Sequence, residues 1–372
     1  MEFKKKVSRI TAFVNRNISK EILDSLKEVG VIDLHLAAAR SPVIEERKGI
    51  FALLPGRDLA DDPLDIISFL VARKAGDSVL NLIIEKGQLN LPGRGSVYSE
   101  EIDLGMAHEL CQENKPDPFE IEKAPFQKLT GICCVVQRGQ GDSIARVALD
   151  TGICVPSLHF GVGTGVRDKM GILRITIPAE KEVINIATSP FDAEIVMKMM
   201  IEVGKLDQPG KGFIYLYPLK QGIINMKVTR GEHRHAASIE QIVAAVDHIK
   251  GGAEWRRRSG TVEKTREKSM DYLTDLVDLT LLCDGGTGTD LVGVAMSAGA
   301  PGATIARLKH VRPQDSPLCE VSPAREACSM IVSNNEVQSI LNALEEADAF
   351  ADCCHGQIQL RRVQKAFTYL GK

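Results

Sequence analysis

Aromatic residues, unbalanced charge and long apolar runs are all scarce in this chain of 372 residues. One Trp and five Tyr leave too few rings for a platform on which single-stranded nucleic acid could stack. A net charge of −3 creates no overall field that would attract nucleic acid or anionic lipid. No apolar run is long enough to cross a bilayer. We therefore expect a cytoplasmic protein without a nucleic-acid partner.

Catalytic and metal-binding patterns are also scarce. The nine cysteines lie mostly in apolar segments without even spacing, which predicts free thiols instead of a disulfide framework. Cys353, Cys354 and His355 are adjacent, but this spacing is not typical of a zinc site, and buried thiols are the plainer interpretation. No Ser/His/Asp or paired-carboxylate pattern stands out. The sequence thus predicts no catalytic residue, no metal and no resident cofactor.

An internal repeat is present, built around a glycine turn. Residues 204–215 read GKLDQPGKGFIY, and residues 87–98 read GQLNLPGRGSVY. In both copies an apolar, helix-like run precedes the turn and a strand-like run follows it. The apolar periodicity around each copy predicts the element order βαββαβ. A repeat of this kind must be recognised before any local assignment, because it determines the domain organisation.

A third, weaker copy is expected toward the C-terminus, where residues 283–299 have the same length as residues 136–152. The chain length also suits two to three domains. We predict unit 1 at residues 1–106, unit 2 at 126–228, a linker with one helix at 229–271, and a degenerate unit 3 at 272–372.

Three short motifs follow one another in the second unit. Residues 135–142 read VVQRGQGD, residues 160–165 read FGVGTG, and residues 209–215 read PGKGFIY. In this order and spacing, over residues 127–222, the unit resembles a PII-type nitrogen-regulatory domain, in particular the PII-like branch with a short first loop. The first unit matches mainly through PGRG at residues 92–95 and through its element order.

The resemblance implies an α+β fold class in which three tandem ferredoxin-like βαββαβ units form an intramolecular pseudo-trimer. Domains of this family form homotrimers with ligand clefts between subunits, so this chain is expected to act as a monomer. The resemblance also implies a signalling protein that binds a small anionic effector, an adenine nucleotide such as ATP, ADP or AMP. Loops at residues 41–63 and 161–171 would then signal to a protein partner, a membrane transporter or a metabolic enzyme.

The resemblance places this effector against the glycine-rich segments. The expected ligand-binding residues are Gly161, Gly163, Thr164, Gly165, Gly210, Lys211, Gly212, Gly93, Arg94, Gly95 and Arg138. Backbone N–H groups of such a turn can form a nest for an anion. The alternative is that glycine serves geometry alone, as a helix end followed by a tight turn. The lysine that follows these glycines in the family is replaced by Phe213 and Ser96, and the two loops contain no tyrosine.

Two other classes of function stay open. An enzyme, either a nucleotide hydrolase or a Rossmann-type oxidoreductase, would use the glycine-rich turn at residues 284–288, which lies between a strand and a helix as in dinucleotide-binding folds. That turn lacks the third glycine of the fingerprint. A scaffold would bind no small molecule at all.

Overall fold

The computed structural model describes residues 5–45, 58–165, 179–225 and 270–371. The first third of the chain forms β1 (Lys5–Asn15), α1 (Arg16–Glu28), β2 (Leu34–Glu45), β3 (Asp58–Val71), α2 (Gly76–Gly87) and β4 (Gly95–Ala107). The middle third forms β5 (Gln127–Gln137), α3 (Gly141–Thr151), β6 (Ser157–Gly165), β7 (Glu180–Thr188), α4 (Ala193–Gly204) and β8 (Gly212–Ile223). The last third forms β9 (Leu276–Asp284), α7 (Gly288–Ser297), β10 (Gly302–Val311), β11 (Ala324–Ser333), α8 (Val337–Glu346), β12 (Gln357–Val363) and β13 (Lys365–Thr368), with short 3₁₀ turns at Pro317–Glu320 and Asn334–Glu336.

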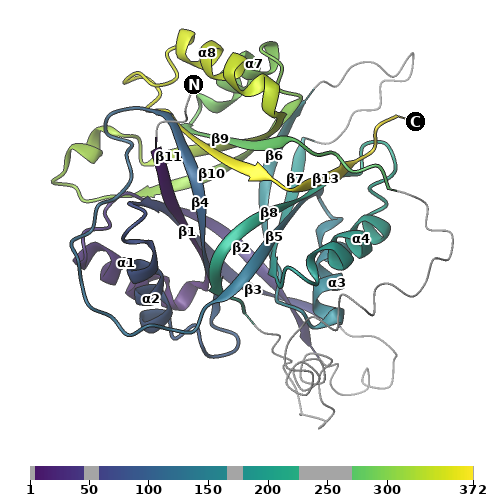
Figure 1. Ribbon diagram of the computed structural model, residues 1–372, viewed down its shortest axis with the longest axis horizontal. Coiled ribbons are helices and arrows are strands. Elements are labelled where there is room, and N and C mark those ends of the chain that lie inside the picture. The colour runs from purple at the N-terminus through teal and green to yellow at the C-terminus, as the bar shows by residue number, and fades with distance from the viewer. Residues whose placement is uncertain (1–4, 46–57, 166–178, 226–269, 372) are drawn as a thin grey trace.

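These strands join in one continuous sheet of 13 strands, in the order β10-β11-β9-β12-β4-β1-β3-β2-β6-β7-β5-β8-β13. Further pairings of β10 with β2 and β6, and of β4 with β8, bend the sheet into a ring-like arrangement around the centre of the molecule (Figure 1). The pairings between the named strands are antiparallel.

The predicted fold class, three tandem ferredoxin-like units that form a pseudo-trimer, is therefore wrong. Hydrogen bonding does not stop at the predicted unit borders, since β12 pairs with β4, β13 with β8, and β2 with β6. The physical reason is that strands such as β4 are longer than their pairing within one third of the chain. β4 pairs with β1 over most of its length, yet Leu104 and Ala107 also pair with β12. An unpaired strand edge leaves backbone N–H and C=O groups without partners, and pairing across the thirds of the chain satisfies them.

The antiparallel pairing also bears on the Rossmann-type alternative. A dinucleotide fold needs parallel strands joined by a crossover helix. β9 and β10 flank the glycine-rich turn and helix α7, but β9 pairs with β11 and β12, and both pairings are antiparallel. The turn itself is tied to the sheet by the Gly285 N–H, which donates to the Ala324 carbonyl at 2.7 Å. A Rossmann-type cofactor site at this turn is thus not supported.

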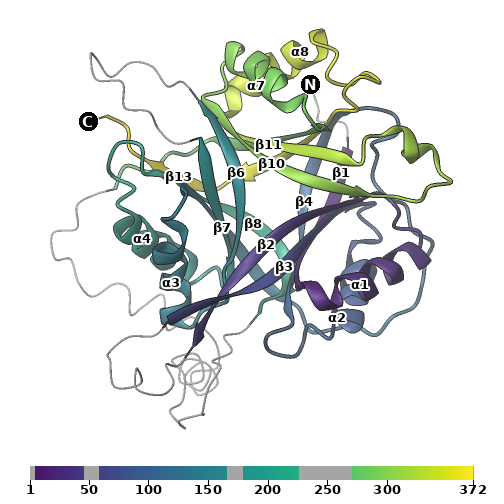
Figure 2. The ribbon, with the colours of Figure 1, turned by 180° about the vertical axis from the view of Figure 1, so that it is seen from behind.

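The described helices lie in pairs outside the sheet: α1 with α2, α3 with α4, and α7 with α8 (Figures 1 and 2). Each pair covers a cluster of buried apolar side chains, represented by Ile22 and Ile83, by Ile144 and Met197, and by Val292 and Ile340. A further apolar cluster, with Phe13 and Tyr217 among its members, lies on the inner side of the sheet. The inner faces of the strands therefore meet side chains from distant parts of the chain.

The two loops expected to carry the signal are partly strands. Residues 41–45 extend β2 and residues 58–63 extend β3, so the irregular segment predicted from 41 to 63 is wrong at both ends. Gly161–Gly165 belong to β6. Residues 46–57 and 166–178, and almost all of the predicted linker at 229–271, lie outside the described residues.

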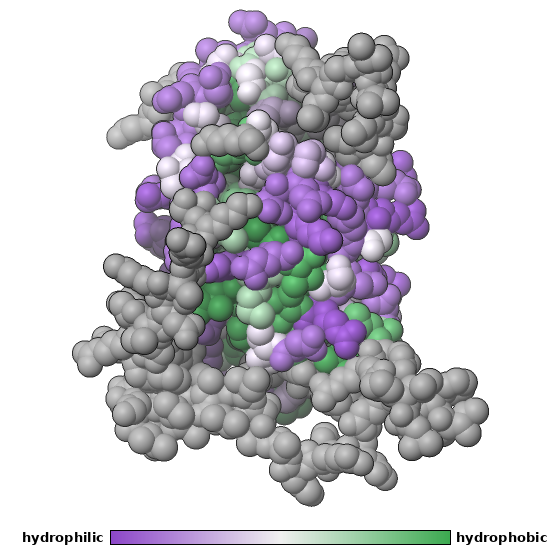
Figure 3. Space-filling model, turned by 90° about the vertical axis from the view of Figure 1, so that its right-hand side faces the viewer, coloured by the Kyte–Doolittle hydropathy of each residue, from purple (hydrophilic) through white to green (hydrophobic). Residues whose placement is uncertain are grey.

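Within the described ranges, we find no helix with the length and apolar character needed to cross a bilayer. Figure 3 views the molecule from the right-hand side of Figure 1 and shows a hydrophobic patch bordered by hydrophilic surface. On α4, which lies on that side in Figure 1, Ile195, Met199 and Val203 are exposed. All nine cysteines are free thiols, as expected from their spacing.

Candidate functional site

Part of the predicted ligand-binding set is brought together at one end of the middle third. Gly161 in β6 lies opposite Lys181 in β7, and Lys181 lies opposite Gln137 in β5. The Gln137 side chain donates a hydrogen bond to the Gly210 carbonyl at 2.8 Å. Gly161, Arg138 and the turn at residues 210–212 therefore form one row across neighbouring strands, which we call the glycine row.

The other predicted residues lie elsewhere. Gly163, Thr164 and Gly165 continue along β6 and pair with β10 of the last third, where Gly165 lies opposite Gly302. The Gly93 N–H donates to Asn225 just beyond the end of β8, whereas Gly212 begins β8. A strand of this length spans roughly 35–40 Å at about 3.3 Å per residue. The two glycine turns thus cannot hold one small ligand together.

Arg94 is already engaged within its own turn. Its guanidinium donates to the Gly87 carbonyl at 3.2 Å and to the Gln88 side chain at 3.1 Å. Arg138 in the glycine row forms an ion pair with Glu180 at 2.8 Å and lies over the Phe160 ring at 5.4 Å. Both predicted arginines therefore have partners within the protein.

Backbone geometry alone requires a glycine at one position in each of the two turns, Gly212 in one and Gly95 in the other. A Cβ atom on Gly212 would lie 2.1 Å from the Val135 carbonyl oxygen, and one on Gly95 would lie 2.2 Å from the Phe13 carbonyl oxygen. Their φ angles, +131° and +142°, also disfavour any residue with a side chain. These two glycines permit the close approach of neighbouring strands, whether or not a ligand binds.

An internal carboxylate occupies the backbone nest that follows β5. The N–H groups of Gly139 and Gly141 donate to Glu182 Oε2 at 2.9 Å and 2.7 Å. The last third repeats this contact, because the Gly288 N–H donates to Glu326 Oε2 at 2.9 Å. These acids stabilise the starts of α3 and α7, where a negative charge is favourable. An external anion is therefore excluded from this nest by the protein itself.

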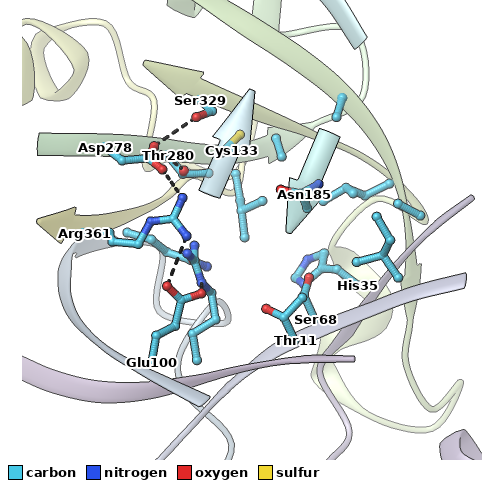
Figure 4. A pocket seen from close by; sticks show the side chains of 18 of the residues that line it. Thr11, His35, Ser68, Glu100, Cys133, Asn185, Asp278, Thr280, Ser329 and Arg361 are labelled. Carbon is cyan, nitrogen blue, oxygen red and sulfur yellow. Dashed lines mark hydrogen bonds and ion pairs between the residues drawn. The ribbon is translucent and has the colours of Figure 1, made fainter. Parts of the chain in front are cut away.

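The main cavity of the described residues lies at the centre of the ring and has a volume of about 200 Å³. Side chains from all three thirds of the chain line it (Figure 4). The polar ones labelled in Figure 4 are Thr11, His35, Ser68, Glu100, Cys133, Asn185, Asp278, Thr280, Ser329 and Arg361. The sequence alone predicts none of these residues as part of a site.

The charged residues of the cavity wall are paired with one another. Arg9 Nε donates to Glu100 at 2.7 Å, Arg361 donates to the same carboxylate at 3.1 Å, and Arg361 also pairs with Asp278. The Arg361 guanidinium lies over the Tyr217 ring, 3.6 Å from its centroid. Burial by itself would raise the pKa of Glu100 and of Asp278, but the attraction of the two arginines outweighs it and lowers both pKa values. The two arginines thus balance the charges of Glu100 and Asp278.

Apart from Asp33, whose carboxylate pairs with His310, other polar groups of the cavity are uncharged at neutral pH. Burial lowers the pKa of His159 to about 4, and its Nδ1 lies 3.3 Å from the Asn185 amide. Burial likewise raises the pKa of the Cys133 thiol to about 11 and the pKa of Tyr217 to about 12. The cavity therefore offers a neutral imidazole, an amide and hydroxyl groups, with no thiolate or phenolate to act as a nucleophile.

Because His159 is neutral in the folded protein, we expect the folded state to lose stability in acid. Its pKa falls from 6.5 to about 4 on folding, so the unfolded chain takes up a proton that the folded chain refuses. Stability should then fall as the pH drops from about 6.5 to about 4, by up to roughly 3 kcal/mol from this group. We expect His159→Gln to remove that part of the loss. Urea unfolding of both proteins at pH 7.5 and 4.5 measures it, and equal pH dependence would contradict the assignment.

The comparisons with known proteins add no assignment to this geometry: no family model matches the chain, and neither does any curated protein.

Proposed function

We propose that the protein binds a small, uncharged polar organic molecule in its central cavity. The observation that carries this proposal is the lining of the cavity, in which charged side chains pair with each other and neutral hydrogen-bonding groups face the open space. Concave sites with an apolar wall and a few convergent polar groups are typical of small-molecule sites. Here the apolar part comes from residues such as Phe13, Val135 and Leu282.

The size of the cavity limits the ligand to about one ring. A dry cavity of about 150 Å³ in another protein accommodates benzene. The volume of about 200 Å³ therefore suits a single-ring molecule with one or two polar substituents. An adenine nucleotide, which adds a ribose and phosphates to a double ring, is too large for it.

The charge balance of the wall favours a neutral ligand. Arg361 and Arg9 already satisfy Glu100 and Asp278, so a bound anion would have to compete with buried carboxylates for the same guanidinium groups. A buried charge without a partner is strongly unfavourable. The neutral His159 and Asn185, in contrast, offer hydrogen bonds without any such competition.

A filling substitution tests the proposal. Ala306 lines the cavity on β10, whereas its neighbour Arg307 is exposed. A panel of neutral single-ring amides and lactams, such as benzamide and uracil, is screened by thermal shift and confirmed by calorimetry. A binder at 100 times its Kd should stabilise the wild type by about 2.7 kcal/mol. We expect Ala306→Leu to abolish this gain and the control Arg307→Leu to retain it. Binding that survives Ala306→Leu, or no binder at all, would reject the cavity as a site.

The nucleotide function implied by the sequence resemblance is a second candidate, at a different place. The observation in its favour is that Gly161, Arg138 and the turn at Gly210 meet in the glycine row. Calorimetry with ATP, ADP and AMP tests it, with Lys211→Glu as the variant and Ala306→Leu as the control. Saturable nucleotide binding lost in Lys211→Glu alone would support this site. A signalling role toward a transporter or a metabolic enzyme stays a prediction that depends on it.

A further inference from the structure

Three potential metal ligands meet at the pairing of β2 with β10. His35 and His310 are directly opposite each other in this antiparallel pair, and Asp33 precedes His35 by two residues. Each of the three offers one ligand atom, and these atoms lie within 4.8 Å of one another. His310 Nε2 lies 2.8 Å from Asp33 Oδ1. The two imidazole rings are nearly parallel, with centroids 5.2 Å apart and planes 9° apart.

One nitrogen of this cluster is left without a hydrogen bond. His310 is 4% exposed, and among the described residues its Nδ1 has no partner. Because no donor reaches Nδ1 from the described residues, this atom can carry the ring proton, which leaves Nε2 unprotonated. Nε2 is the nitrogen that faces the Asp33 carboxylate at 2.8 Å, so a metal ion between them would be bound by both side chains.

The charges around the cluster suit a cation. Asp33 contributes one negative charge, and Arg325, whose positive charge acts on Asp33, forms its own ion pair with Asp284.

We propose that Asp33, His35 and His310 bind a divalent transition metal of the zinc class at the wall of the central cavity. Two imidazole nitrogens and one carboxylate oxygen form a ligand set that zinc accepts, and three protein ligands leave a fourth position open. Asp33 and His35 line the cavity, so this open position faces it. With metal–ligand bonds of about 2.1 Å, tetrahedral ligand atoms lie about 3.4 Å apart, so rotation of the His35 ring closes the site. The inference does not depend on an organic ligand in the cavity.

A second cluster, of His108, Asp352 and His355, is a weaker candidate. The Leu110 N–H donates to His108 Nδ1, so the ring proton lies on Nε2, the atom that faces Asp352 at 2.9 Å. A protonated nitrogen cannot bind a metal. The Asp352 side chain is also 97% exposed. This cluster therefore serves as an internal comparison.

The test is titration of the full-length, chelator-treated protein with Zn²⁺ in competition with a chromophoric chelator, and with Co²⁺ followed by visible absorption. We expect one high-affinity ion per chain. Asp33→Asn keeps the shape of the side chain, and His310→Gln removes a ligand; each should weaken binding by more than about 100-fold, beyond the usual loss of an outer-shell partner. His159→Gln, which changes an imidazole of the same cavity outside the cluster, and Asp352→Asn should bind like the wild type.

Thermal unfolding in the presence of chelator separates misfolding from loss of a ligand. Asp33→Asn with a wild-type melting temperature and no metal binding would support the site. Absence of Zn²⁺ binding by the wild type would overturn the proposal. So would equal affinity in the wild type and Asp33→Asn, or loss of the ion in Asp352→Asn. Each of these results leaves the organic ligand of the cavity, tested separately by Ala306→Leu, unaffected.

Discussion

Replacing Arg361 with methionine is expected to lower the free energy of unfolding by about 3–5 kcal/mol, the usual result when one partner of a buried ion pair is removed. Arg361 joins two buried carboxylates, Glu100 and Asp278, and lies over Tyr217. Methionine keeps much of the stem but leaves Asp278 without its closest cation. The loss should be largest near neutral pH, because both carboxylates are ionised there. Urea unfolding followed by circular dichroism measures it.

The neighbouring arginine provides a matched control. Arg362 lies on the same strand but is exposed, so Arg362→Met should change stability by no more than about 0.5 kcal/mol. Removing the two charges together with their partner, in the triple variant Arg361→Met, Glu100→Gln and Asp278→Asn, should recover part of the loss. If Arg361→Met is no less stable than Arg362→Met, the charge network contributes little to the fold.

Gly212→Ala is expected to destabilise the protein by about 3 kcal/mol or more, from backbone strain and overpacking combined. The new methyl group would lie 2.1 Å from the Val135 carbonyl oxygen, and this atom belongs to the backbone of the adjacent strand, so it cannot rotate away. The φ angle of +131° adds strain. β8 and β5 would have to separate at their ends. The midpoint of urea unfolding measures the effect.

Gly210→Ala is the comparison for this substitution. Gly210 has a φ of +71°, in the left-handed region, where a residue with a side chain costs roughly 1–2 kcal/mol. The difference between the two variants therefore reports the contact with Val135 together with the extra strain of the φ angle at Gly212. Equal stability of the two would show that β8 shifts to accommodate the methyl group. The two variants also help to interpret measurements of nucleotide binding. Loss of binding in Gly212→Ala can result from unfolding, whereas loss of binding in a folded Gly210→Ala indicates that the turn is part of the site.

The repeat shows what a sequence can reveal about this fold. Gly93 and Gly210 occupy matching positions after α2 and α4, with φ angles of 82° and 71°. Glycine marks such turns clearly, because few other residues tolerate their backbone. The same pattern could not reveal that β12 pairs with β4, since strand edges carry no residue type of their own. The predicted separate units failed for this reason.

The cavity was missed because its residues are distant in sequence. Arg361 contacts Asp278, which is 83 residues away in the sequence, and Glu100, which is 261 residues away. No spacing rule covers such distances. One local signal was present: Asp278 is a charged residue in a strand whose other residues are mostly apolar. The structure also places His35 of β2 and His159 of β6 at the cavity wall.

The pairing of β4 with β12 has a consequence for synthesis of the protein. β4 leaves the ribosome long before β12, and until then its outer edge near Leu104 has no permanent neighbour. Contacts between such distant segments form slowly, and open strand edges invite association between chains. A nascent chain of this protein therefore exposes this edge of β4 until its C-terminal strands emerge. A premature stop before β12 would yield an aggregating fragment instead of a smaller working protein.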